Sequence, residues 1–193
     1  MIPDRVRGLL IENAAEGIAV IQDGVVKFAN PKCVEFTGHD QAELHSMPFL
    51  DLVHPDDRLL MAQNYADRLE DKDVPNNYLF RIIDKTGNTK WLQINAVRFA
   101  WEGRPATLSM LNDVTARREA EEAVRASEEK YRGIFDESVV TIYIFDEKKH
   151  FIDTNQAGCD LLGYSREELL RMSIPDVDAD PVIMVGADQE LLT

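Results

Sequence analysis

The chain repeats itself at a constant spacing of 125 residues, the distance that separates Asn30 from Asn155. The same shift superposes six further pairs: Glu12 on Glu137, Gly38 on Gly163, Glu43 on Glu168, Leu44 on Leu169, Met47 on Met172 and Asp51 on Asp176. Self-similarity at one fixed spacing is typical of a duplicated structural unit. The sequence therefore predicts two copies of one fold, with a connecting segment between them.

The first copy has the pattern of an antiparallel sheet. Two short apolar segments, GIAVIQ and GVVKFAN, flank an Asp23-Gly24 turn, which is a strong hairpin signal. Three longer segments follow, namely NYLFRIID, KWLQINAVRFAW and RPATLSMLND. In the second of these, Leu92 and Ile94 alternate with polar side chains, the period of a half-buried strand. We expect three hairpin-connected strands with one covered face.

Short helices are expected between these two groups of strands. Pro31 suits the first turn of a helix that Gly38 ends. Asp40 and Glu43 are spaced as a capping box, which recurs as Ser165 and Glu168. A further helix is predicted from Pro55 to Glu70, with apolar positions that include Leu59, Leu60, Tyr65 and Leu69. We expect Asn30 to fix the corner between strand and helix through bonds from its side chain to the backbone.

A charged helix is predicted between the copies, from Thr115 to about Ile134. It contains no proline and is rich in Ala, Glu, Arg and Lys, which are good helix formers. Its less polar positions are spaced by four, three, four and three residues, as in a coiled-coil seam: Ala120, Val124, Ser127, Tyr131 and Ile134. Two interpretations stay open, a single exposed linker helix and a parallel pair formed by two copies of the chain.

In the order of these elements the chain resembles the PAS domain family. The matching segments are NPKCVEFTG at 30–38, HPDDR at 54–58, Asp113-Val114-Thr115 and SEEKYRGIFDES at 127–138. The resemblance divides the chain into four parts: a lead-in helix at 1–13, a complete PAS domain at 14–113, a coiled-coil-like linker at 114–134, and the N-terminal part of a second, truncated PAS domain at 135–193.

The resemblance implies a fold of the α+β type, with a five-stranded antiparallel sheet, short helices on one face and a long helix after it. It also implies a sensory and dimerisation module that sends its signal out through Asp113 and Thr115. We expect a homodimer, and an output domain that lies outside this chain. A prokaryotic sensor histidine kinase is the first expectation for the parent protein. The alternatives are a diguanylate cyclase, a phosphodiesterase, a transcription regulator and a ligand-free interaction scaffold.

The space between sheet and helices is implied to hold either a small molecule or a plain apolar core, so the cofactor stays open. Six side chains are expected to line it: Phe28, Phe36, Leu60, Phe80, Ile94 and Met110. We do not expect haem at His54, which precedes Pro55 at a helix start, or a flavin adduct at Cys33, which lacks a Gly-Asn-Cys-Arg-Phe setting. Trp91 and Trp101 are expected to pack, or to lie on a dimer face, rather than to stack on a flavin.

The charge of the chain argues against several partners. A net charge of −14 and an isoelectric point near 4.6 exclude the basic face that nucleic-acid binding requires. The same charge disfavours anionic membranes, and no stretch approaches the roughly 18 apolar residues of a membrane span. We expect a cytoplasmic location.

Catalytic signatures are missing from the sequence. It has no GxGxxG, P-loop, GxSxG or GGDEF motif. The remaining histidines, His39, His45 and His150, are scattered, so no metal site is expected. Asp56 and Asp57 are explained by the helix start that they accompany. We therefore expect no enzymatic activity in this chain itself.

Overall fold

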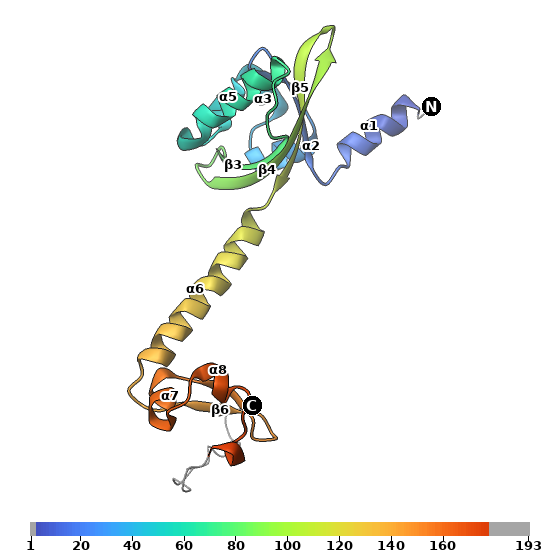
Figure 1. Cartoon of the computed structure of the whole chain (residues 1–193). Coiled ribbons are helices and arrows are strands. Elements are labelled where there is room, and N and C mark those ends of the chain that lie inside the picture. The colour runs from blue at the N-terminus through green and yellow to red at the C-terminus, as the bar shows by residue number, and fades with distance from the viewer. Residues whose placement is uncertain (1–2, 178–193) are drawn as a thin grey trace. The chain divides into compact units, whose positions relative to one another are not determined.

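The chain folds into two compact units, residues 1–121 and 122–193, and the computed structural model describes residues 3–177. The first unit contains a five-stranded sheet and the second a two-stranded one (Figure 1). Mixed α/β architecture with a long helix after the larger sheet confirms the predicted fold class.

The larger sheet is antiparallel throughout, as predicted, in the order β2-β1-β5-β4-β3. Its strands are β1 (Gly17–Gln22), β2 (Val25–Ala29), β3 (Asn77–Ile83), β4 (Thr89–Trp101) and β5 (Arg104–Asp113). β5 therefore lies at the centre of the sheet, between β1 and β4. Because β5 is also the strand that leads into the long helix, that helix begins at the middle of the sheet.

The helices between β2 and β3 cover one face of this sheet (Figure 1). They are α2 (Pro31–Thr37), α3 (Gln41–Ser46), α4 (Phe49–Leu52), the 3₁₀ turn η1 (Pro55–Asp57) and α5 (Arg58–Leu69). The predicted capping box at Asp40 and Glu43 is present, and Gly38 ends α2 in the left-handed conformation at φ 71°. The single turn α4 was not predicted. A separate helix, α1 (Asp4–Glu12), lies where the lead-in helix was expected.

Strand parity decides which residues of the sheet meet the helices. Leu92, Ile94 and Ala96 are almost completely buried, as their alternation with polar residues predicted. On β3 the buried positions are Phe80 and Ile82. These side chains form one core together with residues of the covering helices, among them Phe36, Leu44, Phe49 and Met61.

Of the apolar positions predicted for α5, Tyr65 packs against the core, whereas Leu59 and Leu60 do not. Leu59 is 81% exposed and Leu60 53% exposed, whereas Met61 and Arg68 are buried. The helix starts after the 3₁₀ turn, and its 3.6-residue period then turns positions 61, 64, 65 and 68 toward the sheet. Leu60 precedes Met61 by one residue, which is about 100° around the helix, so it points away.

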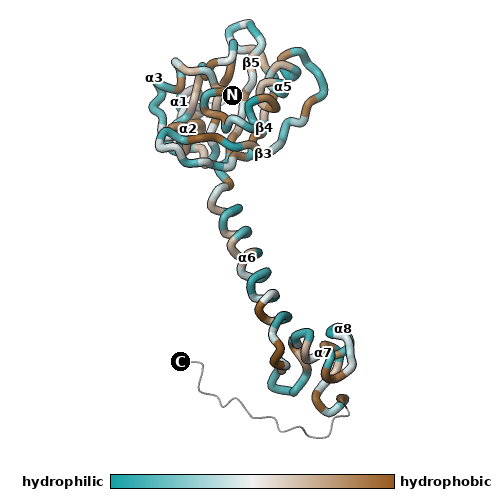
Figure 2. Tube along the Cα trace, turned by 90° about the vertical axis from the view of Figure 1, so that its left-hand side faces the viewer, coloured by the Kyte–Doolittle hydropathy of each residue, from teal (hydrophilic) through white to brown (hydrophobic). Residues whose placement is uncertain are grey.

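The long helix α6 (Thr115–Glu137) extends three residues beyond the predicted end at Ile134. All five residues of the predicted seam are exposed in the single chain: Ala120, Val124, Ser127, Tyr131 and Ile134. The helix is hydrophilic along much of its length and more hydrophobic toward its C-terminal end (Figure 2). There Phe135 is buried and its ring stacks on that of Tyr131 at 5.2 Å.

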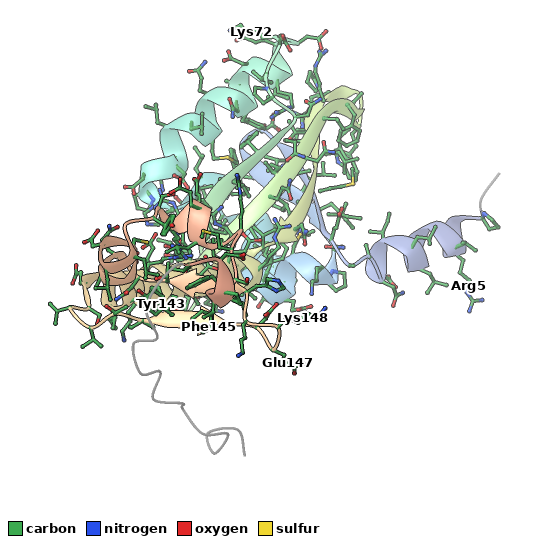
Figure 3. All side chains as sticks on the ribbon, turned by 60° about the horizontal axis from the view of Figure 1, so that its bottom comes forward. Arg5, Lys72, Tyr143, Phe145, Glu147 and Lys148 are labelled. Atoms are coloured by element: carbon green, nitrogen blue, oxygen red, sulfur yellow. The ribbon has the colours of Figure 1, made fainter. Side chains whose placement is uncertain are left out.

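The second unit repeats the first half of the first unit. Its elements are β6 (Tyr143–Phe145), β7 (Phe151–Thr154), α7 (Gln156–Leu162), α8 (Arg166–Leu169) and the 3₁₀ turn η2 (Ile174–Asp176). Tyr143 and Phe145 of β6 (Figure 3) pack with Phe151, whose ring centroid is 4.8 Å from that of Phe145. Within the described residues this unit has two strands, and the rest of the predicted second copy, 178–193, lies outside them.

The duplication extends to individual hydrogen bonds. Asn30 and Asn155 are both buried at the corner between strand and helix. The side-chain oxygen of Asn30 accepts the N–H groups of Ile18 and Cys33, and that of Asn155 accepts those of Ile142 and Gly158. The structural role predicted for Asn30 is confirmed, and its counterpart has the same role.

Candidate functional site

An apolar cavity of about 70 Å³ lies between the sheet and its covering helices. Its wall is built by every strand of the sheet and by α2, α3, α4 and α5. Thr37 and Ser109 bring hydroxyl groups to this wall, and the Thr37 hydroxyl donates to the carbonyl of Cys33 at 2.7 Å. No charged side chain lines it. Small-molecule sites usually occupy roughly 300–1,000 Å³, so this space suits a much smaller, apolar occupant or a filled core.

Three of the six predicted lining residues meet at the cavity, and three do not. Phe36, Phe80 and Ile94 line it. Leu60 points away from the sheet because it is about 100° around α5 from the buried Met61. Met110 is 38% exposed on the opposite face of the sheet. Phe28 lies directly across from Val20 on β1, while the neighbouring positions Ala19 and Ile21 face the cavity.

Cys33 is buried in the cavity wall. Its thiol lies 3.5 Å from the carbonyl oxygen of Ile18, and burial raises its pKa to about 12. A thiol with such a pKa remains protonated at neutral pH, and the protonated form is a poor nucleophile. The local environment therefore gives Cys33 the properties of a small core residue.

His54 caps the 3₁₀ turn that precedes α5. Its Nδ1 accepts the N–H of Asp56 at 3.4 Å. Across residues 3–177, no cluster of three or more His, Cys, Asp or Glu side chains has the arrangement of a metal site.

The predicted exit from the sheet is held by a small network around Trp91. Asp113 accepts both the backbone N–H and the hydroxyl of Thr115, at 2.9 and 2.6 Å. The Thr115 hydroxyl oxygen in turn accepts the N–H of Trp91 at 2.9 Å, and the carbonyl of Trp91 accepts the N–H of Val114, also at 2.9 Å. The first residue of α6 is thereby tied to β4 as well as to its own strand.

The Trp91 ring is also the meeting point of two guanidinium groups. The Cζ atom of Arg118, in the second turn of α6, lies 4.3 Å from the ring centroid, and that of Arg81, on β3, lies 5.5 Å from it. Arg81 is anchored by Asp57, whose carboxylate accepts two bonds from its guanidinium at 2.7 and 3.0 Å. These bonds lower the pKa of the Asp57 carboxyl below its usual value.

Neither tryptophan lines the cavity, and both pack against neighbouring side chains. Trp101 meets Phe99 edge-on, with ring centroids 6.0 Å apart. Sequence reasoning did not identify the link from Trp91 to α6. The register of the hairpin contained the signal, because Arg81 and Trp91 are direct cross-strand partners on the face turned away from the cavity.

Comparison with known proteins identifies the family. Residues 26–111 match the PAS fold family and residues 129–191 match a second PAS domain family. The chain carries two PAS domains. Both of these family models describe PAS domains.

The PAS domains of this chain are similar to those of signalling kinases. Sporulation kinase E of Bacillus subtilis (strain 168) is 32% identical over 91 residues, which are 47% of this chain and 12% of the kinase. The chain thus spans only a small part of that relative's length.

A solved PAS domain has the same fold. A PAS domain from Colwellia psychrerythraea is 17% identical and aligns with a TM-score of 0.50 over 58% of this chain and 97% of that one. A sensory box histidine kinase/response regulator from Burkholderia thailandensis E264 is 24% identical, with a TM-score of 0.49 over 66% of this chain and 98% of that one.

Within residues 3–177, no helix is both long enough and apolar enough to span a membrane.

Proposed function

We propose that this chain is the sensory and dimerisation region of a prokaryotic sensor histidine kinase of the cytoplasm, and that it relays a signal through α6 to an output domain outside the chain. The proposal assigns residues 14–113 to the first PAS domain, 114–134 to a coiled-coil-like linker and 135–193 to the N-terminal part of the second. The kinase as parent protein is supported by the similarity to Sporulation kinase E.

The observation that carries the relay is the attachment of α6 to the sheet. The helix follows β5 directly, and Thr115 is hydrogen-bonded to Trp91 of β4. Since β4 and β5 both contribute to the cavity wall, a change in the twist of these strands changes the direction in which α6 leaves the sheet. A pair of helices with two registers would then be the bistable element that a switch requires.

A cysteine scan along α6 tests the dimer. Single cysteines from 118 to 136, introduced into the full chain with Cys33 and Cys159 replaced by serine, are oxidised under mild conditions. We expect cross-linking maxima at the seam, which consists of Ala120, Val124, Ser127, Tyr131 and Ile134, and minima between these positions. The same Cys-free background without an added cysteine is the control. A monomeric chain, or cross-linking without the four-three spacing, would contradict a paired linker.

A second candidate, a ligand-free interaction scaffold, is favoured by the size of the cavity. About 70 Å³ is too little for a haem or a flavin without rearrangement of the helices. An absorbance spectrum and a native mass spectrum of one purified sample show whether the core holds a ligand. A visible band or additional mass indicates a bound cofactor or metabolite and contradicts the ligand-free scaffold, and a colourless sample at the bare dimer mass indicates a filled core, which both the scaffold and a ligand-free relay require.

A diguanylate cyclase, a phosphodiesterase and a transcription regulator remain alternatives for the parent protein. Each would use the same relay, and they differ only in the output domain. Sequencing of the gene beyond this region decides among them.

A further inference from the structure

A continuous set of contacts leads from the cavity wall to α6 by way of β3 and Trp91. Val53 lines the cavity and pairs with Ile82 of β3 in an isolated bridge. The next residue, His54, donates its N–H to the carbonyl of Arg81 at 2.9 Å. The segment that closes one side of the cavity is therefore attached to β3 at the residue whose side chain reaches Trp91.

We propose that Arg81, Trp91 and Arg118 form one clamp, which couples the helical cover of the cavity to the second turn of α6. This inference rests on the proposed relay and names the residues that transmit it. Arg81 and Trp91 act as positioning residues for the helix, since neither lines the cavity.

The first half of the clamp is rigid. Asp57 receives three bonds from Arg81, one from its backbone N–H at 2.8 Å and two from its guanidinium, and Asp56 adds a fourth at 3.2 Å. Asp57 belongs to η1, which directly precedes α5. A carboxylate that binds a guanidinium through two parallel bonds fixes its direction as well as its distance. Arg81 therefore follows the position of η1.

The second half of the clamp depends on the aromatic ring. Arg118 lies over Trp91, and within the described residues it has no carboxylate partner, unlike Arg117 and Arg125 on the same helix. A guanidinium over an indole ring is held by the attraction of the cation to the negative face of the ring. Since Trp91 is the cross-strand partner of Arg81, a shift of Arg81 changes the ring environment of Arg118.

Intermediate position alone does not establish coupling between two sites, and a double-mutant cycle provides that test. Four proteins are compared as full chains: the wild type, Arg81→Met, Arg118→Met and the double variant. The observable is hydrogen exchange at the backbone amides of residues 118–121, measured by NMR or by mass spectrometry. Arg117→Met is the matched control, because Arg117 is a neighbouring arginine whose contact is with Glu121 and not with Trp91.

We expect Arg118→Met to raise the exchange rate of these amides about two- to fivefold, as expected for the loss of one partly exposed cation–π contact. Arg81→Met should raise it at the same amides, although Arg81 does not belong to α6. The double variant should show less than the product of the two single effects. Arg118→Lys, which keeps a cation over the ring, should restore much of the protection.

Two results would overturn the clamp: unchanged exchange at 118–121 in Arg81→Met, or single effects that multiply in the double variant. Amides of β4 around Leu92 must keep wild-type exchange, which shows that the sheet is intact. Failure of the clamp and failure of the proposed dimer are distinguishable, because the cysteine scan reports pairing while this cycle reports coupling inside one chain. If the chain is a monomer but Arg81 and Arg118 are coupled, the clamp is supported and the dimer is refuted. If the helices pair but Arg81 and Arg118 are not coupled, only the clamp is refuted.

Discussion

Removal of the Asn30 side chain should lower the free energy of unfolding of the first unit. The side chain is 1% exposed and makes four hydrogen bonds to the backbone. Its oxygen accepts from Ile18 and Cys33 at 2.9 and 3.3 Å, and its nitrogen donates to the carbonyls of Ile11 and Glu16, both at 3.0 Å. It thus joins α1, β1 and α2 at one corner.

The expected loss follows from these bonds. In Asn30→Ala the N–H of Cys33 retains the backbone carbonyl of residue 30 at 3.0 Å, the carbonyl of Ile11 retains the N–H of Ala14 at 3.4 Å, and Glu16 is exposed to water, so the N–H of Ile18 is the group left without a partner. At about 1–3 kcal/mol for one partner left without a bond, the free energy of unfolding should fall by about 1–3 kcal/mol. With a urea dependence of about 1.5 kcal/mol per molar, the midpoint should fall by about 0.7–2 M.

Tryptophan fluorescence during urea denaturation measures this change selectively. The chain has two tryptophans, Trp91 and Trp101, and both belong to the first unit. Asn155→Ala is the matched control, because Asn155 makes the corresponding bonds in the second unit. It should leave the tryptophan transition unchanged and lower the midpoint of a transition followed by far-UV circular dichroism. A loss below about 0.5 kcal/mol in Asn30→Ala, or an equal shift of the tryptophan signal in Asn155→Ala, would refute this reasoning.

Three further predictions concern single groups. Bonds from the hydroxyl of Thr86 and the backbone of Asn88 lower the pKa of Asp84 to about 2. Because the folded pKa is lower than the unfolded value of about 3.9, the stabilisation is present above that value and is lost as the pH falls toward 2. In Asp84→Asn the free energy of unfolding should therefore fall less steeply than in the wild type as the pH is lowered from about 4 toward 2. An unchanged dependence on pH in this range would contradict the prediction. Burial raises the pKa of Cys33 to about 12, so a disulfide reagent at neutral pH should modify this thiol only after urea unfolding, and rapid labelling of the native chain would refute that. Ile134→Glu should abolish the proposed dimer in light-scattering measurements, whereas the exposed Leu59→Glu on α5 should not; a dimer that survives Ile134→Glu contradicts the seam.

Most of the fold could be predicted because the chain contains two copies of one pattern. The turn at Asp23 and Gly24, the capping box and the alternation around Ile94 depend on local chemistry, and each is present as expected. β5 was harder, because Leu108 and Met110 are apolar while Thr107 and Ser109, which alternate with them, are polar. The register with β4 places Ser109 opposite Ala96 in the core and turns Met110 outward. Local alternation favours the wrong face here, and only the pairing with the neighbouring strand corrects it.

The candidate site was partly predictable for a related reason. Phe36, Phe80 and Ile94 were identified because the helical period and the alternation of side chains along the strands place them in the core. The clamp around Trp91 was missed, since Arg118 belongs to a helix that lies well beyond the hairpin of Arg81 and Trp91 in the sequence. Only the pairing of β3 with β4 and the direction in which α6 leaves the sheet bring them together.

The two ends of α6 have different tasks in the proposed relay. The first turns are held by Thr115 and Arg118 at Trp91, whereas the small seam residues, Ala120 and Ser127, bury little apolar area when two helices pair. The larger apolar side chains, Tyr131 and Ile134, lie near the other end and are 46% and 67% exposed in the single chain. Pairing energy scales with the apolar area that is removed from water, so it would be concentrated there. A helix that is fixed to its sheet at one end and paired at the other transmits a rotation along its length, because its backbone hydrogen bonds resist unwinding. Weak packing in the first half of the seam is therefore a requirement of the relay, since strong pairing beside the clamp would oppose the motion that the clamp transmits.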